Sequence, residues 1–164
     1  MKVYFLRHAA ALDGPVDAAR PLSPGGRRQA RKLARFLRRA GVQFDLAFTS
    51  PLVRARQTIE AVCTITNQGE RIEPQVTEAL LNDTSPAAFA QWLEALPKEG
   101  HVLLVGHEPS LSAHVRRMLE LKNVASLELA KGAVACIKTT DQRRGVLKFL
   151  ITPKSLGLGR DRPA

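Results

Sequence analysis

The stretch HVLLVG at residues 101–106 decides the fold class, because it is apolar from Val102 to Val105. A strand of this kind is buried on both faces, which is typical of the parallel sheets of α/β proteins. Working outward, we predict further strands at residues 3–6, 44–50, 72–76, 126–129, 133–138 and 146–151. Apolar residues at helical spacing predict helices at residues 24–40, 52–66, 86–96 and 109–119.

Strands and helices alternate along most of the chain, which is the pattern of an α/β protein with helices on both faces of its sheet. The turn-forming residues 141–145 predict a hairpin between the last two strands. We therefore expect a single three-layer α/β/α domain over residues 1–154, with a mostly parallel central sheet. Residues 155–164 are expected to form a flexible C-terminal tail.

Composition excludes several classes of protein. With 45% hydrophobic residues in 164 positions, the chain is not disordered. No apolar run approaches the roughly 20 residues of a membrane helix. The first apolar segment stops at Arg7-His8, which is too short for the core of an export signal. Cys63 and Cys136 have apolar neighbours, so we expect buried, reduced thiols and a cytoplasmic protein, although a disulfide between them is an open alternative.

The formal charge of +10 is concentrated early in the chain, where residues 1–40 carry ten Lys and Arg against two Asp. Most of this excess lies on the predicted helix, from Arg27 to Arg39. The stretch is either a solvated helix face or a docking surface for an acidic protein or a nucleic acid. Its single aromatic residue, Phe36, gives little support for base stacking, so we expect no nucleic acid partner.

Three predicted strands run into histidines or arginines. Residues 3–6 are followed by Arg7 and His8, residues 101–106 by His107, and residues 44–50 by a helix whose first turn contains Arg54. Ligands of open α/β sheets bind beyond the carboxyl ends of the strands. We therefore expect these side chains to meet at one site.

The residue types at this site indicate phosphoryl transfer. Arginine guanidinium groups match phosphate oxygens, and a neutral histidine ring supplies a nitrogen nucleophile. Metal binding by the two histidines is the competing interpretation, but neighbouring arginines repel a cation. The sequence also lacks cysteines and histidines at the spacing of zinc ligands. We expect neither a metal nor a cofactor.

Four motifs resemble those of the histidine phosphatase superfamily: Leu6-Arg7-His8-Ala9, Arg20-Pro21-Leu22-Ser23, Ser50 to Thr58, and Val105-Gly106-His107-Glu108-Pro109. The similarity extends from residue 2 to about residue 140, and the short chain is most similar to the SixA-type protein phosphohistidine phosphatases. One departure is Ala9, where the superfamily has glycine. A backbone conformation that only glycine adopts would not be available there.

The resemblance implies a role for each motif residue. His8 would be the nucleophile that forms a phosphohistidine intermediate, and Arg7, Arg54 and a protonated His107 would line the phosphate pocket. Arg20 would contact the phosphate or substrate, or else anchor its loop through an ion pair. Arg56 is expected to be structural or to face solvent.

The general acid is implied less directly. Glu78 lies in the region where the superfamily has its acid, and capping or surface exposure are the alternatives. Glu108 could instead orient His107. A phosphohistidine substrate has an imidazole leaving group, which solvent can protonate, so a strong acid is not required.

The short segment between the second and third predicted helices bears on the substrate class. Only about 30 residues separate Arg54 from the third helix at Ser85, so we expect the minimal fold without a lid insertion. An open groove suits phosphohistidine on a protein, such as a phosphotransfer domain in signal transduction. Two alternatives are a metal-independent phosphomonoesterase for a small phosphorylated metabolite and a basic module that binds nucleic acid or an acidic protein.

Overall fold

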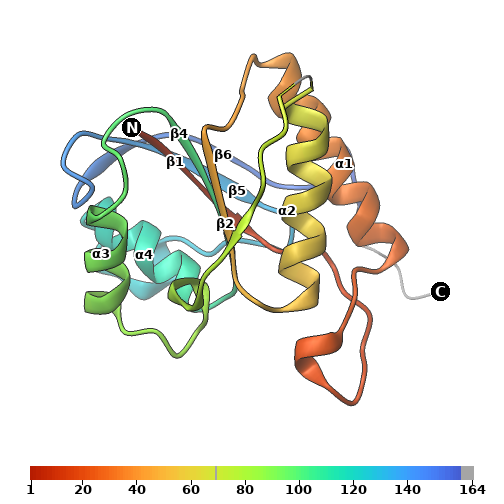
Figure 1. The fold of residues 1–164 in the computed structure, drawn as a ribbon. Coiled ribbons are helices and arrows are strands. Elements are labelled where there is room, and N and C mark those ends of the chain that lie inside the picture. Colours follow the sequence, from red (N-terminus) through yellow and green to blue (C-terminus); the bar gives the residue numbers. More distant parts are fainter. Residues whose placement is uncertain (69, 160–164) are drawn as a thin grey trace.

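The structure, a computed structural model, describes residues 1–68 and 70–159. Its centre is a six-stranded sheet of order β3-β2-β4-β1-β5-β6 (Figure 1). The strands are β1 (Lys2–Arg7), β2 (Leu46–Thr49), β3 (Gln75–Val76), β4 (His101–Gly106), β5 (Val134–Thr139) and β6 (Gly145–Ile151). The first four strands run parallel, and β5 and β6 are antiparallel to their neighbours. The expected mostly parallel sheet is confirmed.

Helices cover both faces of the sheet, which confirms the three-layer α/β/α prediction (Figure 1). The helices are α1 (Pro24–Arg39), α2 (Val53–Thr66), α3 (Pro86–Glu94) and α4 (Ser110–Met118). Three short 3-10 turns are η1 (Asp17–Ala19), η2 (Glu78–Leu80) and η3 (Val124–Ser126). The pair α1 and α2 lies on one face, and α3 and α4 lie on the other.

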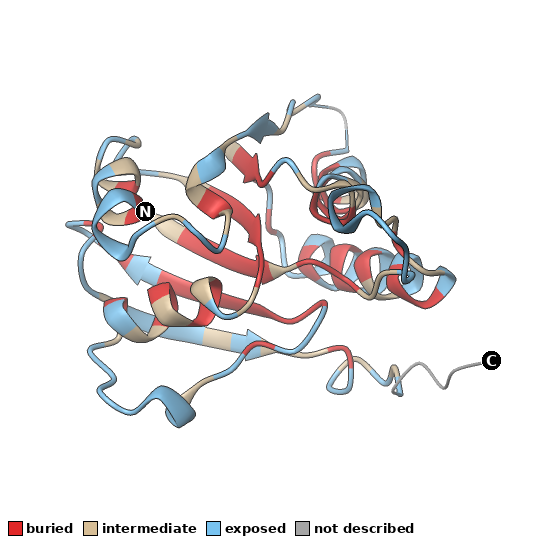
Figure 2. Cartoon of the chain, turned by 90° about the horizontal axis from the view of Figure 1, so that it is seen from below, coloured by how far each residue is buried: buried red, intermediate tan, exposed pale blue. Residues whose placement is uncertain are grey.

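Alternating side chains of β1 divide the apolar residues into two cores, because successive residues of a strand point to opposite faces. Tyr4 and Leu6 pack with Leu33 of α1 and Ile59 of α2. Val3 and Phe5 belong to the second core, beneath α3 and α4. The helices accordingly show buried residues toward the sheet and exposed residues away from it (Figure 2).

The order of the strands assembles the site. Because β4 lies between β2 and β1, its register sets Arg7 beside Gly106 and Thr49 beside Val105. Residues 102–105 are fully buried, as expected for an apolar central strand. Segments that begin at residues 8, 50 and 107 therefore leave the sheet at the same edge.

The start of α1 is fixed by capping and close packing. The Ser23 hydroxyl accepts a hydrogen bond from the Gly26 amide, and Pro24 occupies the first turn, where its missing N–H is not needed. A side chain at Gly26 would overlap the carbonyl oxygen of Ala10. Glycine therefore lets α1 pack directly against the loop that follows His8.

The strand expected at residues 126–129 is wrong. This segment begins with the end of η3 and continues as irregular backbone, although Leu129 is buried. The reason is that side chains take its backbone hydrogen bonds: the Leu129 amide donates to the Ser112 hydroxyl, and the Leu129 carbonyl accepts from Arg7. The strand expected at 72–76 is shorter, because only Gln75–Val76 pairs with β2.

Cys63 and Cys136 are both free and buried, as expected. Within the described residues, no helix is long and apolar enough to span a membrane. Of the tail expected at 155–164, the structure describes residues 155–159, where Ser155 and Thr152 exchange hydrogen bonds. Residues 160–164 lie outside the described residues, so the tail and the domain boundary at residue 154 stay predictions.

Candidate active site

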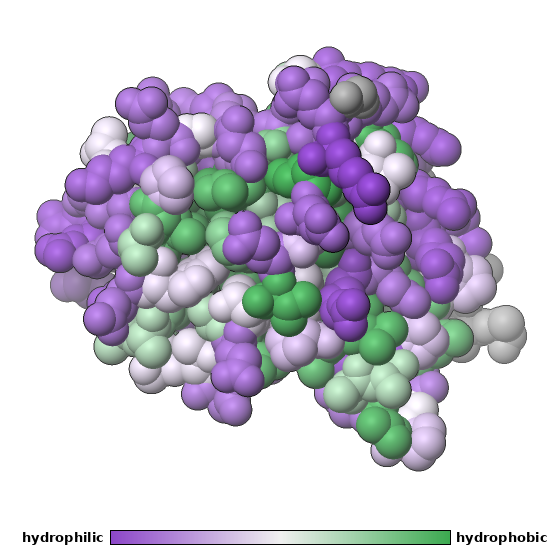
Figure 3. Space-filling view, viewed as in Figure 1, coloured by the Kyte–Doolittle hydropathy of each residue, from purple (hydrophilic) through white to green (hydrophobic). Residues whose placement is uncertain are grey.

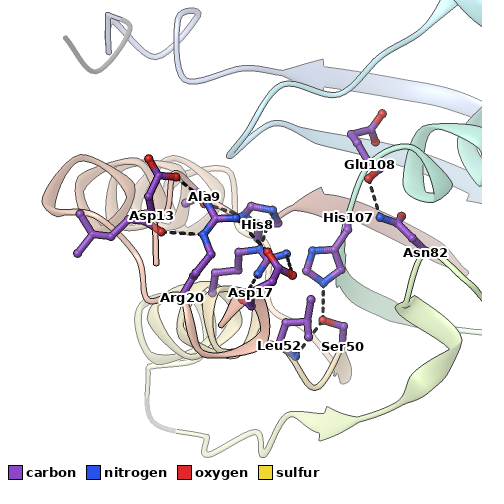
Figure 4. A network of polar contacts seen from close by, with 12 residues as sticks. His8, Ala9, Asp13, Asp17, Arg20, Ser50, Leu52, Asn82, His107 and Glu108 are labelled. Atoms are coloured by element: carbon purple, nitrogen blue, oxygen red, sulfur yellow. Dashed lines mark hydrogen bonds and ion pairs between the residues drawn. The ribbon is translucent and has the colours of Figure 1, made fainter. Parts of the chain in front are cut away.

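Two histidines lie side by side where β1 and β4 end (Figure 4). The ring centroids of His8 and His107 are 5.0 Å apart, with the rings tilted by 47°. Only 6% of His8 and 4% of His107 is exposed. The topology thus brings together two residues that are 99 positions apart in the sequence.

The ring of His8 is held in a defined tautomer. Its Nδ1 lies 2.7 Å from the Ala9 carbonyl oxygen, which can only accept, so Nδ1 carries the proton. The Nε2 atom accepts a hydrogen bond of 3.3 Å from Nε of Arg54. Burial, aided by the charges of His107, Arg54 and Arg7, lowers the pKa of His8 to about 3. His8 is therefore neutral at pH 7, with the lone pair of Nε2 directed toward a guanidinium group.

The ring of His107 is held from the opposite nitrogen. Its Nε2 lies 2.6 Å from the Ser50 hydroxyl, and its Nδ1 is buried with no hydrogen-bond partner among the described residues. Burial, together with the charges of Arg54 and Arg7, lowers the pKa of His107 to about 4. The protein groups around it keep the ring neutral at pH 7, and a protonated His107 beside a bound phosphoryl group stays a prediction.

Asp17 orients the guanidinium of Arg54. Arg54 is 7% exposed, and its Nη1 donates to the Asp17 carbonyl at 2.8 Å. Its Nη2 lies 3.2 Å from Asp17 Oδ2. Hydrogen bonds from Arg20 and then from Arg54 hold the pKa of Asp17 below its usual range. The carboxylate and the backbone of one loop residue thus leave Nε of Arg54 directed at His8.

A chain of hydrogen bonds links Arg7 to the loop after β4. Nη1 of Arg7 donates to the Leu129 carbonyl at 2.8 Å, and the Leu129 amide donates to the Ser112 hydroxyl at 2.9 Å. That hydroxyl donates to Oε1 of Glu108 at 2.7 Å. The idea that Glu108 orients His107 is therefore wrong, because its carboxylate points away from the ring and binds Ser112 (Figure 4).

Arg20 is tied into its own loop, which is one of the two alternatives. Its Nε donates to the Leu12 carbonyl at 2.8 Å, and its other nitrogens lie 3.0 Å from Asp17 and 3.5 Å from Asp13. It thereby shares Asp17 with Arg54 and reaches the phosphate pocket through that carboxylate. A direct contact between Arg20 and a substrate stays a prediction. Arg56 is exposed, as expected.

Glu78 begins η2 beside the site. The Thr77 amide donates to the Thr49 carbonyl at 2.9 Å. Because Glu78 directly follows Thr77 and Ser50 directly follows Thr49, the start of η2 lies near Ser50. At the other end of η2, the Leu80 carbonyl packs against Gly106, which precedes His107. The Glu78 residue is exposed. The turn is close to both residues of the His107 to Ser50 contact, and the role of Glu78 as the acid stays a prediction.

Side chains of α1 and α2 hold the loop after His8 by accepting hydrogen bonds from its backbone amides. The amides of Ala9, Ala10 and Leu22 donate to Thr58, Gln29 and Gln57, respectively, at 3.1, 3.0 and 2.8 Å. Among the described residues other than glycine, only Glu120 and Gln142 have positive φ. Ala9 therefore needs no conformation reserved for glycine, and its side chain is fully buried.

Sequence reasoning did not identify four residues that position the site: Asp17, Ser50, Thr58 and Ser112. Ser50 directly follows a strand, so the rule that identified His8 and His107 applies to it as well. Thr58 lies four residues after Arg54 and donates to its carbonyl at 2.7 Å, a spacing that places both on one helix face. Asp17 and Ser112 carry no comparable local signal.

The site as a whole is suited to an anion. Nδ1 of His107 and Nε of Arg7 are both buried without partners among the described residues. Buried polar atoms of this kind are rare unless something else binds them. Within residues 1–68 and 70–159, no group of three or more His, Cys, Asp or Glu residues is arranged to hold a metal ion. The charges that act on both rings are the guanidinium groups of Arg7 and Arg54, which bind oxyanions rather than cations.

Known proteins share both the sequence pattern and the fold. The family model of the histidine phosphatase superfamily (branch 1) matches residues 3–85. An uncharacterized protein of Picosynechococcus is 34% identical over 95% of this chain and 99% of its own. The phosphohistidine phosphatase SixA of Escherichia coli is 26% identical over 98% of this chain and 99% of its own. A structure of the protein histidine phosphatase SixA with tungstate has a TM-score of 0.84 at 25% identity, over 95% of this chain and 99% of that chain.

Proposed function

Because the chain belongs to the histidine phosphatase superfamily and is similar to SixA in sequence and fold, we propose that it hydrolyses phosphohistidine on a protein through a covalent intermediate on His8. The observation that carries the proposal is the fixed tautomer of His8, whose Nε2 lone pair faces Arg54 at 3.3 Å. A neutral ring nitrogen beside permanently charged guanidinium groups is suited to attack a phosphoryl group.

In the first step, Nε2 of His8 attacks the phosphorus of the substrate phosphohistidine. A P–N bond to His8 forms while the P–N bond to the substrate imidazole breaks, and that imidazole takes a proton. In the second step, water attacks the phosphorus, inorganic phosphate leaves, and the electron pair returns to Nε2. The proton bound to Nδ1 stays on the ring, because the Ala9 carbonyl holds it at 2.7 Å.

Arg7, Arg54 and His107 are proposed to bind the phosphoryl oxygens. Charge spreads over these oxygens in the transition state, so donors placed in advance lower the barrier. A dianionic phosphoryl group beside His107 favours the charged ring, which raises its pKa above the value of about 4 set by the protein groups. A proton on His107 would then arrive with the substrate, and Nδ1 is its unpartnered atom.

Glu78 is proposed to protonate the leaving group, from its place on the turn beside Ser50 and Gly106. For an imidazole leaving group, solvent can supply this proton, so we expect a modest contribution from Glu78. The demand for an acid is greater with a phosphate ester, whose leaving group is an alkoxide.

Two observations support a protein substrate. The E. coli relative is named a phosphohistidine phosphatase. Between α2 and α3, the described residues form only β3 and η2, so no inserted lid closes over a small molecule. We propose a reaction that needs no metal, because the guanidinium groups supply the positive charge that a metal would provide.

The proposal is tested by trapping the intermediate. The enzyme is mixed with a phosphotransfer domain that carries 32P-phosphohistidine and is quenched in base, where phosphohistidine survives. The wild type should retain acid-labile label, and His8→Ala should retain none, with kcat lower by a factor on the order of 10⁴ or more.

His101→Asn is the matched control, because His101 lies at the opposite end of β4 and should leave the labelling unchanged. Sugar phosphates are assayed in parallel. Full activity of His8→Ala, or faster hydrolysis of a sugar phosphate than of the phosphohistidine protein, would overturn the proposal.

A further inference from the structure

Arginine and lysine side chains cover the solvent face of α1. The helix buries Ala30, Leu33, Ala34 and Leu37 and contains no acidic residue. Its exposed basic residues are Arg27, Arg28, Arg31, Lys32, Arg35, Arg38 and Arg39. Four of these arginines recur at every fourth position, and like charges at this spacing repel each other on a helix. In the part of the chain that the structure describes, Arg31 and Arg35 form no ion pair.

Two further segments extend this positive surface. A side chain at Gly132 would lie 3.2 Å from Oε1 of Gln29 in α1 and 3.1 Å from Pro153, so the three segments meet at this glycine. The neighbours Lys131 and Lys154 are both exposed. We define the basic surface as these two lysines together with the exposed Arg and Lys residues of α1. Figure 3 shows hydrophilic residues over the helices on the right of the molecule, as well as along its top and left.

The basic surface adjoins the active site. The Gly132 amide donates to the carbonyl of His8 at 3.1 Å, so Lys131 lies one residue away from a direct contact with the nucleophile's backbone. At the start of α1, the Ser23 amide donates to the Ala10 carbonyl at 2.9 Å. One rigid body can therefore contact the basic surface while its phosphohistidine enters the pocket.

The opposite side of the molecule differs in its charge. Beside α3 and α4, Arg143 is paired with Glu94 at 3.0 Å and Arg144 with Glu120 at 3.2 Å. Arg116 and Arg117 of α4 donate to the backbone carbonyls of Leu127 and Pro86. The four arginines of that side are thus held by groups of the protein, whereas α1 presents a continuous row of basic side chains with no acidic residue in the helix.

We propose that the basic surface docks an acidic face of the protein that carries the phosphohistidine; this rests on the function proposed above. The 16 residues of α1 extend over about 24 Å, which is enough to form one side of an ordinary protein interface. A nucleic acid fits less well, because Phe36 is the helix's only aromatic residue for stacking on bases. Attraction between the two surfaces accelerates association and weakens as salt is added.

The test compares two double charge reversals. Arg31→Glu with Arg35→Glu alters the basic surface, and the new carboxylates have Arg27 and Arg39 one turn away, so the helix is preserved. Lys98→Glu with Lys122→Glu makes the same charge change in the exposed segments after α3 and α4. The substrates are an acidic phosphotransfer domain phosphorylated on histidine and free phosphohistidine.

We expect the α1 variant to lose roughly tenfold or more of kcat/KM on the phosphorylated domain at low salt, with kcat little changed. This loss should shrink in 0.5 M salt, as expected for screened charges on the order of 10 Å apart. Free phosphohistidine should be hydrolysed at the wild-type rate, and the Lys98 and Lys122 variant should match the wild type on both substrates.

Three results would overturn docking: equal losses in both double variants, a loss on free phosphohistidine as well, or an α1 variant that loses DNA affinity while its rate on the domain is unchanged. A failure of the proposed function is seen separately. In that case the wild type itself would not hydrolyse the phosphorylated domain, whatever the state of α1, and the docking proposal would fall with it.

Discussion

A buried histidine follows each of the strands β1 and β4, and hydrogen bonds hold the two rings at opposite nitrogens. His8 after β1 is fixed through Nδ1, by the carbonyl of the next residue, and its Nε2 faces Arg54. His107 after β4 is fixed through Nε2, by Ser50, and its Nδ1 is unpartnered among the described residues. Burial lowers the pKa of both rings, to about 3 and about 4.

Hydrogen bonds, rather than pKa values, therefore distinguish the two rings and the roles proposed for them. Both rings are neutral at pH 7, so charge alone does not distinguish nucleophile from phosphate ligand. The second nitrogen of His8 faces the guanidinium of Arg54, whereas the second nitrogen of His107 is buried without a partner among the described residues. Four experiments test this comparison between the two histidines and the contacts that hold them.

The largest effect after loss of His8 is expected from His107→Ala. It removes one hydrogen-bond donor to the phosphoryl group but leaves the nucleophile, so kcat should fall by roughly 10²- to 10³-fold. Base-stable, acid-labile 32P on the variant should still be detected in a quench. If the label disappears as completely as in His8→Ala, the two rings do not have separate roles.

Asp17→Ala addresses the cation that faces His8. Without its carboxylate, Arg54 loses the 3.2 Å contact at Nη2, and the guanidinium is less well oriented. We expect kcat/KM to fall by about tenfold, consistent with the cost of imperfect positioning. Asp13→Ala is the matched control, because Asp13 pairs only with Arg20, at 3.5 Å. Equal losses in the two variants would show that the loop, and not Arg54, is affected.

Ser112→Ala tests the chain of hydrogen bonds that connects Arg7, at the end of β1, with Glu108, in the loop after β4. The buried Leu129 amide and the Glu108 carboxylate each lose a partner, which should lower the free energy of unfolding by about 1–3 kcal/mol. Because Arg7 binds the Leu129 carbonyl, we also expect a few-fold rise in KM. Ser126→Ala, in η3, provides the comparison with an exposed serine. Lower stability with an unchanged KM would mean that the chain of bonds does not position Arg7.

The smallest effect on activity is expected from His114→Phe, which tests whether burial alone sets these pKa values. His114 lies outside the site, stacks on Phe89 with ring centroids 3.6 Å apart, and has a pKa lowered by burial to about 4. A histidine whose folded pKa is lowered takes up its proton only in the unfolded state between about pH 6.5 and 4, so stability falls as pH drops through this window. Denaturant unfolding at pH 7 and pH 5 measures this fall.

The fall should be smaller in His114→Phe than in the wild type by up to about 2 kcal/mol, because one fewer proton is taken up on unfolding. Phosphatase activity at pH 7 should be unchanged. An identical pH dependence in both proteins would show that His114 is protonated in the folded state.

Much of the fold could be predicted from local patterns. The apolar run of β4 has the length of a strand rather than of a helix, and the apolar residues of α1 and α2 recur at helical spacing, so both signals are strong. The segment at 126–129 was predicted wrongly, because its backbone groups bond to Ser112 and Arg7, which lie far away in the sequence. A local pattern cannot show that distant side chains, rather than a neighbouring strand, will form the hydrogen bonds of a segment's backbone.

The residues of the candidate site are likewise of two kinds: those that a local pattern predicts and those that only contacts between distant parts of the chain reveal. Arg7, His8 and His107 can be predicted because they lie where apolar strands end, and Arg54 because it lies in the first turn of the helix after such a strand, positions that parallel topology brings together. Asp17 was missed because it is an exposed loop residue whose importance comes only from its contact with Arg54. The lowered pKa of His107 could not be predicted either, because the burial that causes it cannot be inferred from one residue and its neighbours in the sequence.

The sequence by itself determined the α/β class, the residues at the strand ends and the positive charge of α1, because periodicity, motif and composition are local properties. The packing of the folded chain sets which nitrogen of each histidine is hydrogen-bonded, which carboxylate holds Arg54, and that the basic surface lies beside His8. These properties depend on distances between residues far apart in the chain, and β4 fixes those distances by lying between β1 and β2.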